Sequence, residues 1–131
     1  MNGVLARWGG PLYAILRIMA GLMFMMHGTQ KILGLPPRQG GGPAVASLPW
    51  IAGVLELVLG ALTVVGFLTG VAAFIASGLM AAAYFIAHAP QGFFPIANRG
   101  ELAAVYCFLF LFMAAYGSGP FSVDAALRRR R

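Results

Sequence analysis

The stretch WIAGVLELVLGAL, residues 50–62, places one charged side chain, Glu56, inside an otherwise apolar run. Its other residues are mostly small or branched and apolar, which is typical of a helix buried in lipid or protein. A charge near the centre of a membrane span costs about 2.5–3.5 kcal/mol on the insertion scale. We therefore expect Glu56 to face the interior of a helix bundle and to have a partner there.

The composition indicates an integral membrane protein. Of the 131 residues, 60% are hydrophobic and only 9% are charged, and the mean hydropathy is +0.85. Soluble domains carry about 25% charged residues, and a chain this short cannot bury so much apolar surface in one core. The lipid bilayer is therefore the first partner that the sequence predicts.

The charge pattern and the cysteine content exclude two classes of function. Four of the nine basic residues form the terminal run Arg128–Arg131, and the others are scattered. Such residues beside apolar spans usually set membrane topology, so no nucleic-acid partner is expected. The single cysteine, Cys107, rules out redox chemistry by a CxxC pair within this chain.

The chain is predicted to be an all-α integral membrane protein, a four-transmembrane-helix bundle formed by residues 1–131 as one domain. Both termini are expected in the cytoplasm of a bacterial-type inner membrane, because Arg7 and Arg128–Arg131 would then follow the positive-inside rule. Residues 118–131 would form a short cytoplasmic basic tail. The apolar stretches, each near the required length of about 20 residues, are 12–33, 48–66, 70–87 and 102–116.

Three ionisable residues of the first span, Arg17, His27 and Lys31, recur at helical spacing and share one face. Taking Lys31 and Trp50 as markers of the outer interface, His27 lies about 6 Å inward and Glu56 about 9 Å inward at 1.5 Å per residue. The pattern predicts one outward-facing polar pocket between the helices. Its ionisable groups are His27, Lys31, Glu56, His88 and Glu101.

Arg17 lies about 21 Å inward from Lys31, near the cytoplasmic side, and about 12 Å from the level of Glu56. A bridge to Glu56 would be stretched. We expect a structural ion pair with Asp124 instead, with Ser122 as the N-cap of a short helix that folds back beneath the bundle. A lipid phosphate is the alternative partner for Arg17.

The predicted pocket suits a ligand that gains or loses protons. A histidine beside a carboxylate can relay protons to a carbonyl or hydroxyl group, so Glu56 and His27 are the candidate catalytic residues and a quinone is the candidate ligand. Lys31 and Arg99 would orient this ligand, or would attract an anion to the mouth of the pocket. The expected apolar lining consists of Phe24, Tyr84, Tyr106 and Phe108.

The motifs do not favour a bound metal or haem. The histidines and glutamates lack the HxxxH or ExxH spacing of metal sites on one helix. The chain has no CxxCH haem motif, nucleotide-binding loop or Ser–His–Asp arrangement. A faint repeat is present, because each half runs helix, outer histidine, Pro-containing loop and glutamate-bearing helix.

Three stretches in order resemble motifs of the DoxX family. The first-helix motif is LRIMAGLMFMMHGTQKILG (16–34), and the second-helix glutamate with its Gly-rich turn is GVLELVLGALTVVGFLTGVAA (53–73). The third loop and C-terminal pattern correspond to residues 88–127, which include an Asn–x–Gly–Glu sequence. The motif residues that carry over are Arg17, Gly21, Gly28, Lys31, Glu56, Gly60, Asn98, Gly100, Glu101, Ser122 and Asp124.

The resemblance implies a four-helix inner-membrane protein. Some DoxX members or their DoxD relatives are associated with thiosulfate:quinone oxidoreductase or other membrane oxidoreductase complexes. The resemblance also adds Asn98 to the candidate ligand-binding residues. That set is then Lys31, His88, Asn98, Arg99 and Glu101.

The leading hypothesis is a non-autonomous subunit of a quinone-linked oxidoreductase system, related to sulfur compounds or redox stress. Its partners would be further copies of the chain or other membrane redox subunits. One alternative is a non-catalytic structural or assembly subunit, in which the polar cluster only locks helices together. The other is a small-solute or proton-coupled transporter, which four short helices could form only as an oligomer.

Overall fold

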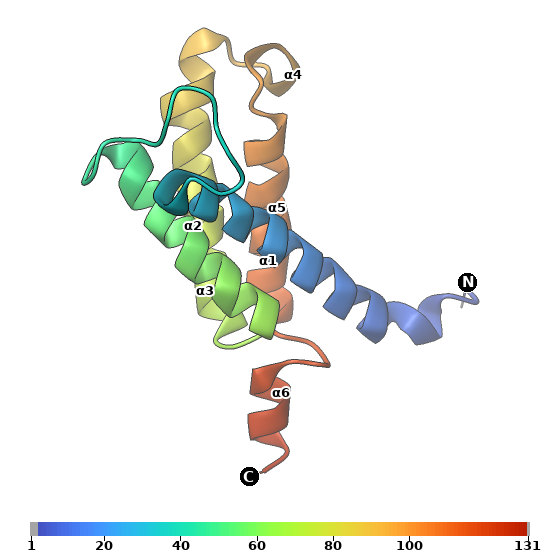
Figure 1. Cartoon of the computed structure of the whole chain (residues 1–131). Coiled ribbons are helices and arrows are strands. Elements are labelled where there is room, and N and C mark those ends of the chain that lie inside the picture. Colours follow the sequence, from blue (N-terminus) through green and yellow to red (C-terminus); the bar gives the residue numbers. More distant parts are fainter. Residues whose placement is uncertain (1–2, 131) are drawn as a thin grey trace.

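The computed structural model describes residues 3–130 and is all-helical in that range. Arg131, the end of the predicted basic run, lies outside the described residues. A short 3-10 turn, Ala6–Trp8, precedes α1, and α3 continues through a π-helical segment, Tyr84–His88. The helices are α1 (Gly9–Leu33), α2 (Leu48–Val65), α3 (Thr69–Ala83), α4 (Pro95–Asn98), α5 (Glu101–Tyr116) and α6 (Val123–Arg128) (Figure 1).

Three helical stretches are long and apolar enough to cross a membrane, namely Ala6–Leu33, Leu48–Val65 and Thr69–Gln91. They match the first three predicted spans to within a few residues. The fourth, α5, is a shorter apolar helix of 16 residues. At 1.5 Å per residue it is about 24 Å long, less than the roughly 30 Å of a bilayer core.

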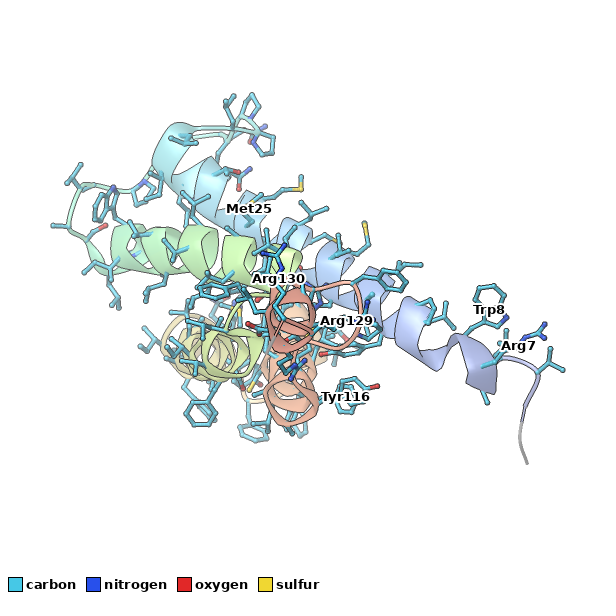
Figure 2. The ribbon with its side chains drawn as sticks, turned by 90° about the horizontal axis from the view of Figure 1, so that it is seen from below. Arg7, Trp8, Met25, Tyr116, Arg129 and Arg130 are labelled. Atoms are coloured by element: carbon cyan, nitrogen blue, oxygen red, sulfur yellow. The ribbon has the colours of Figure 1, made fainter. Side chains whose placement is uncertain are left out.

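The helices form two crossed pairs rather than one bundle of nearly parallel rods. The first pair is α1 with α2, and the second is α3 with α5. From below, the blue and green ribbons of the first pair run lengthwise while the second pair is seen nearly end-on (Figure 2). Phe24 of α1 joins the pairs, with ring centroids 5.6 Å from Tyr106 and 4.8 Å from Phe110 of α5.

Glycines bring the backbones of α1 and α2 into direct contact. A Cβ placed on Gly28 would lie 2.5 Å from the amide nitrogen of Leu57 and 2.6 Å from the carbonyl oxygen of Gly53. Gly21 and Gly60 make a similar backbone contact further along the two helices: a Cβ on Gly60 would lie 2.9 Å from the carbonyl oxygen of Gly21. Such close approach gives the van der Waals contact that holds helices together in lipid. Gly53 and Gly60 on α2 therefore serve close helix packing.

The predicted ion pair between Arg17 and Asp124 is wrong. Arg17 is fully buried, and its guanidinium donates to three carbonyl oxygens instead. Nη1 donates to Thr63 at 2.5 Å and Val64 at 2.7 Å, and Nη2 donates to Phe121 at 2.9 Å. Because the first two belong to the last turn of α2, the cation lies at the negative end of that helix dipole.

Asp124 lies at the opposite kind of helix end. Its carboxylate accepts hydrogen bonds from the amides of Leu68, at 3.1 Å, and Thr69, at 3.4 Å, where α3 begins. The Ser118 hydroxyl also donates to it. Burial opposes ionisation, but these hydrogen bonds outweigh it and lower the pKa of Asp124. The two side chains thus stabilise the α2–α3 turn from both sides.

The short C-terminal helix begins as predicted. The Ser122 side chain accepts a hydrogen bond from the amide of Ala125 at 3.1 Å and caps α6. The amide of Asp124 donates to the carbonyl of Gly66 at 3.0 Å, which attaches this segment to the α2–α3 turn. The turn, and with it the relative placement of α2 and α3, therefore depends on residues from both ends of the chain.

The Gly28 contact can be tested with a matched glycine. We expect Gly28→Ala to lower the free energy of unfolding by about 1–3 kcal/mol, because the new methyl group meets backbone that cannot move aside. In Gly78→Ala the new methyl group would meet nothing within 4 Å, so no loss is expected. Thermal unfolding in detergent, followed by circular dichroism, compares the two. Equal stability of both variants would contradict a tight α1–α2 contact.

Candidate functional site

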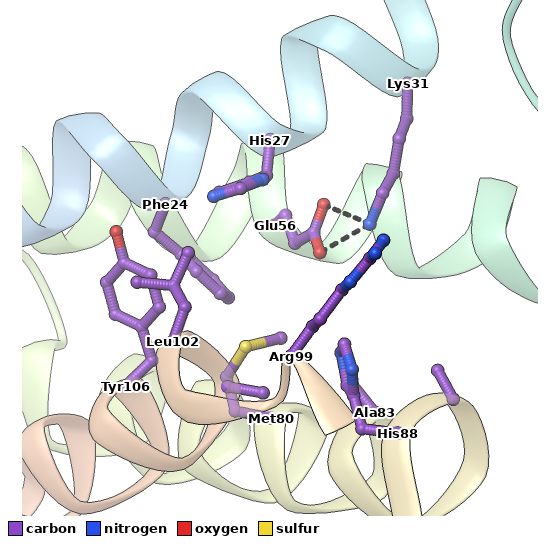
Figure 3. A pocket seen from close by; sticks show the side chains of 12 residues that line it. Phe24, His27, Lys31, Glu56, Met80, Ala83, His88, Arg99, Leu102 and Tyr106 are labelled. Carbon is purple, nitrogen blue, oxygen red and sulfur yellow. Dashed lines mark hydrogen bonds and ion pairs between the residues drawn. The ribbon is translucent and has the colours of Figure 1, made fainter. Parts of the chain in front are cut away.

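A cavity of about 310 Å³ lies where the two helix pairs cross (Figure 3). Each of the four long apolar helices contributes to its wall, and so does the loop before α5. One end is polar and charged, whereas the other is aromatic and aliphatic. The lining residues are Phe24, His27, Lys31, Glu56, Met80, Ala83, Ala87, His88, Arg99, Leu102, Ala103 and Tyr106.

Glu56 faces this cavity and pairs with Lys31. The ammonium nitrogen of Lys31 lies 2.7 Å from Oε1 and 2.9 Å from Oε2 of Glu56, so both carboxylate oxygens share one cation. The side chains are 22% and 5% exposed, respectively. Within residues 3–130 this is the only ion pair. It neutralises a carboxylate that would otherwise be unpaired at a position remote from water.

Gly53 explains how Lys31 reaches this carboxylate. A Cβ on Gly53 would lie 2.8 Å from Cβ and 3.2 Å from Cδ of Lys31. The lysine side chain therefore lies against the bare backbone of α2 and ends one helical turn away, at Glu56. A larger residue at position 53 would block this path. The glycine serves both the close helix contact and the ion pair.

His27 lines the same cavity but does not bond to Glu56. Its ring is exposed and meets the ring of Tyr106 edge-on, with centroids 6.4 Å apart. No hydrogen bond to His27 is found among the residues described. The two candidate catalytic residues thus share a cavity without contacting one another directly, and a ligand or water would have to connect them.

His88 and Arg99 close the cavity on the side of α3 and α5. Nδ1 of His88 lies 3.1 Å from the carbonyl oxygen of Asn98, which orients the imidazole. The Arg99 side chain points towards the Lys31–Glu56 pair (Figure 3). With Lys31 and Arg99 charged against the single carboxylate of Glu56, this end of the cavity has a net charge of +1 before either histidine is protonated. It favours an anion or an electron-rich oxygen.

Two candidate ligand-binding residues, Asn98 and Glu101, lie outside the lining. Asn98 is buried, and its amide donates to the carbonyl of Gly92 at 2.6 Å and to the hydroxyl of Tyr84 at 3.1 Å. It therefore fixes the loop that carries Arg99. Glu101 is exposed in the first turn of α5, where a carboxylate suits the positive helix end.

The aromatic end of the cavity differs partly from expectation. Phe24 and Tyr106 line it as expected, but Phe108 is 71% exposed and lies outside the lining. Tyr84 is buried behind the wall, where its hydroxyl donates to the carbonyl of Phe93. The Tyr106 hydroxyl is buried without a hydrogen-bond partner among residues 3–130.

Five lining residues were not expected from the sequence: Met80, Ala83, Ala87, Leu102 and Ala103. Met80, Ala83 and Ala87 recur at steps of three and four on one helical face. That spacing was the available signal, but it fits ordinary helix packing equally well.

Comparison with known proteins places this chain among small membrane proteins. The family model described as DoxX matches residues 12–89. An uncharacterized protein of Haemophilus influenzae is 46% identical over 116 residues, covering 85% of this chain and 87% of that protein. An uncharacterized membrane protein of Mycobacterium tuberculosis is 30% identical over 141 residues, covering 93% and 85%, respectively. No solved structure matches significantly.

A double-mutant cycle tests the Lys31–Glu56 pair. Lys31→Met and Glu56→Gln are each expected to lower the free energy of unfolding by roughly 3 kcal/mol, because each single change leaves the other group without its partner. The double variant should lose much less than the sum of the two. Unfolding in mixed detergent micelles gives the free energy of unfolding of the two single variants and the double variant.

Glu101→Gln is the matched control, because it removes an exposed carboxylate that has no ion-pair partner among residues 3–130. It should change stability by less than about 0.5 kcal/mol. Additive losses at Lys31 and Glu56 would mean that the two side chains are not coupled in the folded protein.

Proposed function

The chain belongs to the DoxX family of membrane proteins, and from this premise we propose that it binds a quinone as a subunit of a quinone-linked oxidoreductase system. The observation that carries the proposal is the two-ended cavity, in which charged groups face an aromatic wall across a space of about 310 Å³. Small-molecule sites have this character, and their volumes begin near 300 Å³. A quinone head group needs polar groups for its carbonyl oxygens and an apolar wall for its ring, and this cavity offers both.

The residues present fit such a ring. Its carbonyl oxygens would accept hydrogen bonds from the Lys31 ammonium and the Arg99 guanidinium, which are the cations of the polar end. Its flat faces would lie among Phe24, Tyr106 and Leu102, whose side chains form the apolar end.

The protein's part in the chemistry would be to move protons. When bound, a quinone supplies a two-electron, two-proton couple, and the electrons would come from a partner subunit. His27 and His88 stand on opposite sides of the cavity, and their ring nitrogens would be the groups that hold or pass a proton beside the ligand. Glu56 is engaged through both oxygens by Lys31, so that pair would have to open before Glu56 could exchange a proton with the ligand. Proton exchange by positioned side chains of this kind is general acid–base catalysis.

The proposal includes a membrane orientation. The short helix α5 would complete a fourth span, with the bilayer thinned or the helix ends solvated to accommodate its length. The cavity end carries Lys31 and Arg99, whereas α6 with its arginines lies at the other end of the α3–α5 pair (Figure 1). The positive-inside rule then puts both termini in the cytoplasm of an inner membrane. Residues 118–130 would be the cytoplasmic basic tail.

One observation favours a purely structural subunit as the second candidate. The Lys31–Glu56 pair joins α1 to α2, two helices whose backbones already touch at Gly28 and Gly53. A lock between these helices would need no ligand. On that account, removing the pair lowers stability and leaves the activity per folded molecule of any complex unchanged.

Direct binding separates these candidates. In lipid nanodiscs the protein is expected to bind a short-chain quinone saturably, as measured by quenching of tryptophan fluorescence. The Lys31→Met/Glu56→Gln double variant and Arg99→Gln should each weaken binding by about tenfold or more, since each removes a charge-assisted hydrogen bond.

Arg38→Gln provides the control, because Arg38 is also an exposed arginine but lies in the α1–α2 loop outside the lining. The Arg38→Gln variant should bind the short-chain quinone with the same affinity as the unmodified protein. Absence of saturable binding, or equal binding by all variants, would refute the quinone proposal and favour the structural subunit.

A further inference from the structure

A second cavity of about 270 Å³ lies between α2 and α3 and is almost entirely apolar. Its rim includes Leu48, Ile51 and Ile86, whose side chains are largely exposed on the protein surface. For a chain of this composition that surface faces lipid. The other residues that line this cavity, here called the α2–α3 groove, include Ala52, Leu55, Leu79 and Ala82.

The groove and the polar cavity share a wall. Lys31, Ala83 and Ala87 line both. The carbon stem of Lys31 can face the groove while its ammonium group bonds to Glu56 in the polar cavity, as long cationic side chains commonly do. The other two shared residues are alanines, so no bulky side chain from α3 stands between the two spaces.

The groove follows from the way α2 and α3 are connected. A tight turn at residues 66–68 holds the helices together at one end, fixed there by Arg17 and Asp124. From that turn the two helices diverge towards the end that carries Lys31 (Figure 1). α2 packs mainly on α1 and α3 mainly on α5, although α2 and α3 also contact one another. Among the described residues, no other helix fills the space between their diverging ends. Its opening faces the bilayer.

We propose that the α2–α3 groove holds the isoprenoid chain of the quinone whose head group lies beside Lys31 and Glu56. This inference rests on the proposed function and extends it to the ligand's class, a long-chain lipid-soluble quinone that enters sideways from the membrane. The argument rests on the two spaces being adjacent, since Lys31, Ala83 and Ala87 line both of them. Apart from Lys31, every residue that lines the groove is apolar, so an apolar chain lying there is removed from water.

Substitutions that fill the groove test this without altering the polar cavity. Ala52→Phe and Ala82→Phe place large side chains in the groove, and neither residue lines the polar cavity. Ala61→Phe is the matched control, because Ala61 is an exposed residue of α2 that lines neither space. Each protein is reconstituted in nanodiscs of one lipid composition. Binding is measured for two probes, a tail-free benzoquinone and the same ring with an eight-isoprene chain.

In both groove variants the affinity for the tailed probe should fall by roughly tenfold, because the chain loses its packing contacts. Affinity for the tail-free ring should stay the same, and the control should match the unmodified protein for both probes. Using one lipid composition makes membrane partition of each probe equal across variants.

The contrary outcomes are distinct. If the groove variants bind the tailed probe as tightly as the unmodified protein does, the groove holds only membrane lipid and this inference is wrong, while the quinone site stands. If both probes weaken together, the substitutions disturb the polar cavity and the groove has no separate role. If the unmodified protein binds neither probe, both the proposed function and this inference fail.

Discussion

The arrangement of this protein depends on keeping one carboxylate paired inside an apolar environment. Glu56 is almost completely buried, and Lys31 from the neighbouring helix contacts both of its oxygens. Separating such a pair in a low-dielectric interior leaves an uncompensated charge, which costs several kcal/mol. α1 and α2 must therefore keep their register, and the contacts of Gly28 and Gly53 allow the short distance that this register requires.

The two polar ends of the molecule satisfy their charges in different ways. At the α2–α3 turn, Arg17 donates to three carbonyls and Asp124 accepts from two amides and a hydroxyl, so both charges are bound by the protein itself. Among the described residues, Nε of Arg17 and Oγ1 of Thr69 have no partner, but no cavity borders them. At the other end the Lys31–Glu56 pair borders a cavity, with Arg99 pointing towards it. The first arrangement has the character of a structural joint. The second leaves hydrogen-bonding capacity for a ligand, which is why the proposed site lies there.

Much of this could be predicted from the sequence because lipid imposes simple rules. Long apolar runs mark the first three spans, and the spacing of His27 and Lys31, together with the depth of Glu56, brings all three to one cavity. The predicted ion pair between Arg17 and Asp124 is wrong because each charge has a closer partner in the backbone groups of a helix end. Arg17 binds carbonyls at the end of α2, and Asp124 binds amides at the start of α3. That competition depends on where a turn places its backbone groups, which spacing along a single helix does not reveal.

Features that depend on how the helices pack could not be predicted from the sequence pattern of any single helix. The crossing of the two pairs, the placement of Asn98 behind the wall and the outward orientation of Phe108 depend on how helices rotate against one another. Asn98 lies beyond the residues 12–89 that the family model matches, and its role here is to support the loop that presents Arg99. Membership of the DoxX family covers the first three long helices, so the part of the site contributed by α5 rests on the geometry alone.

The most direct test of the central claim is an experimental density map of the protein purified in lipid from its own membrane. We expect flat, ring-shaped density between the Lys31–Glu56 pair and Tyr106, continuing as a thin chain between α2 and α3. A map in which Leu102 and Met80 pack directly against the ion pair, leaving no space beside Glu56, would contradict it.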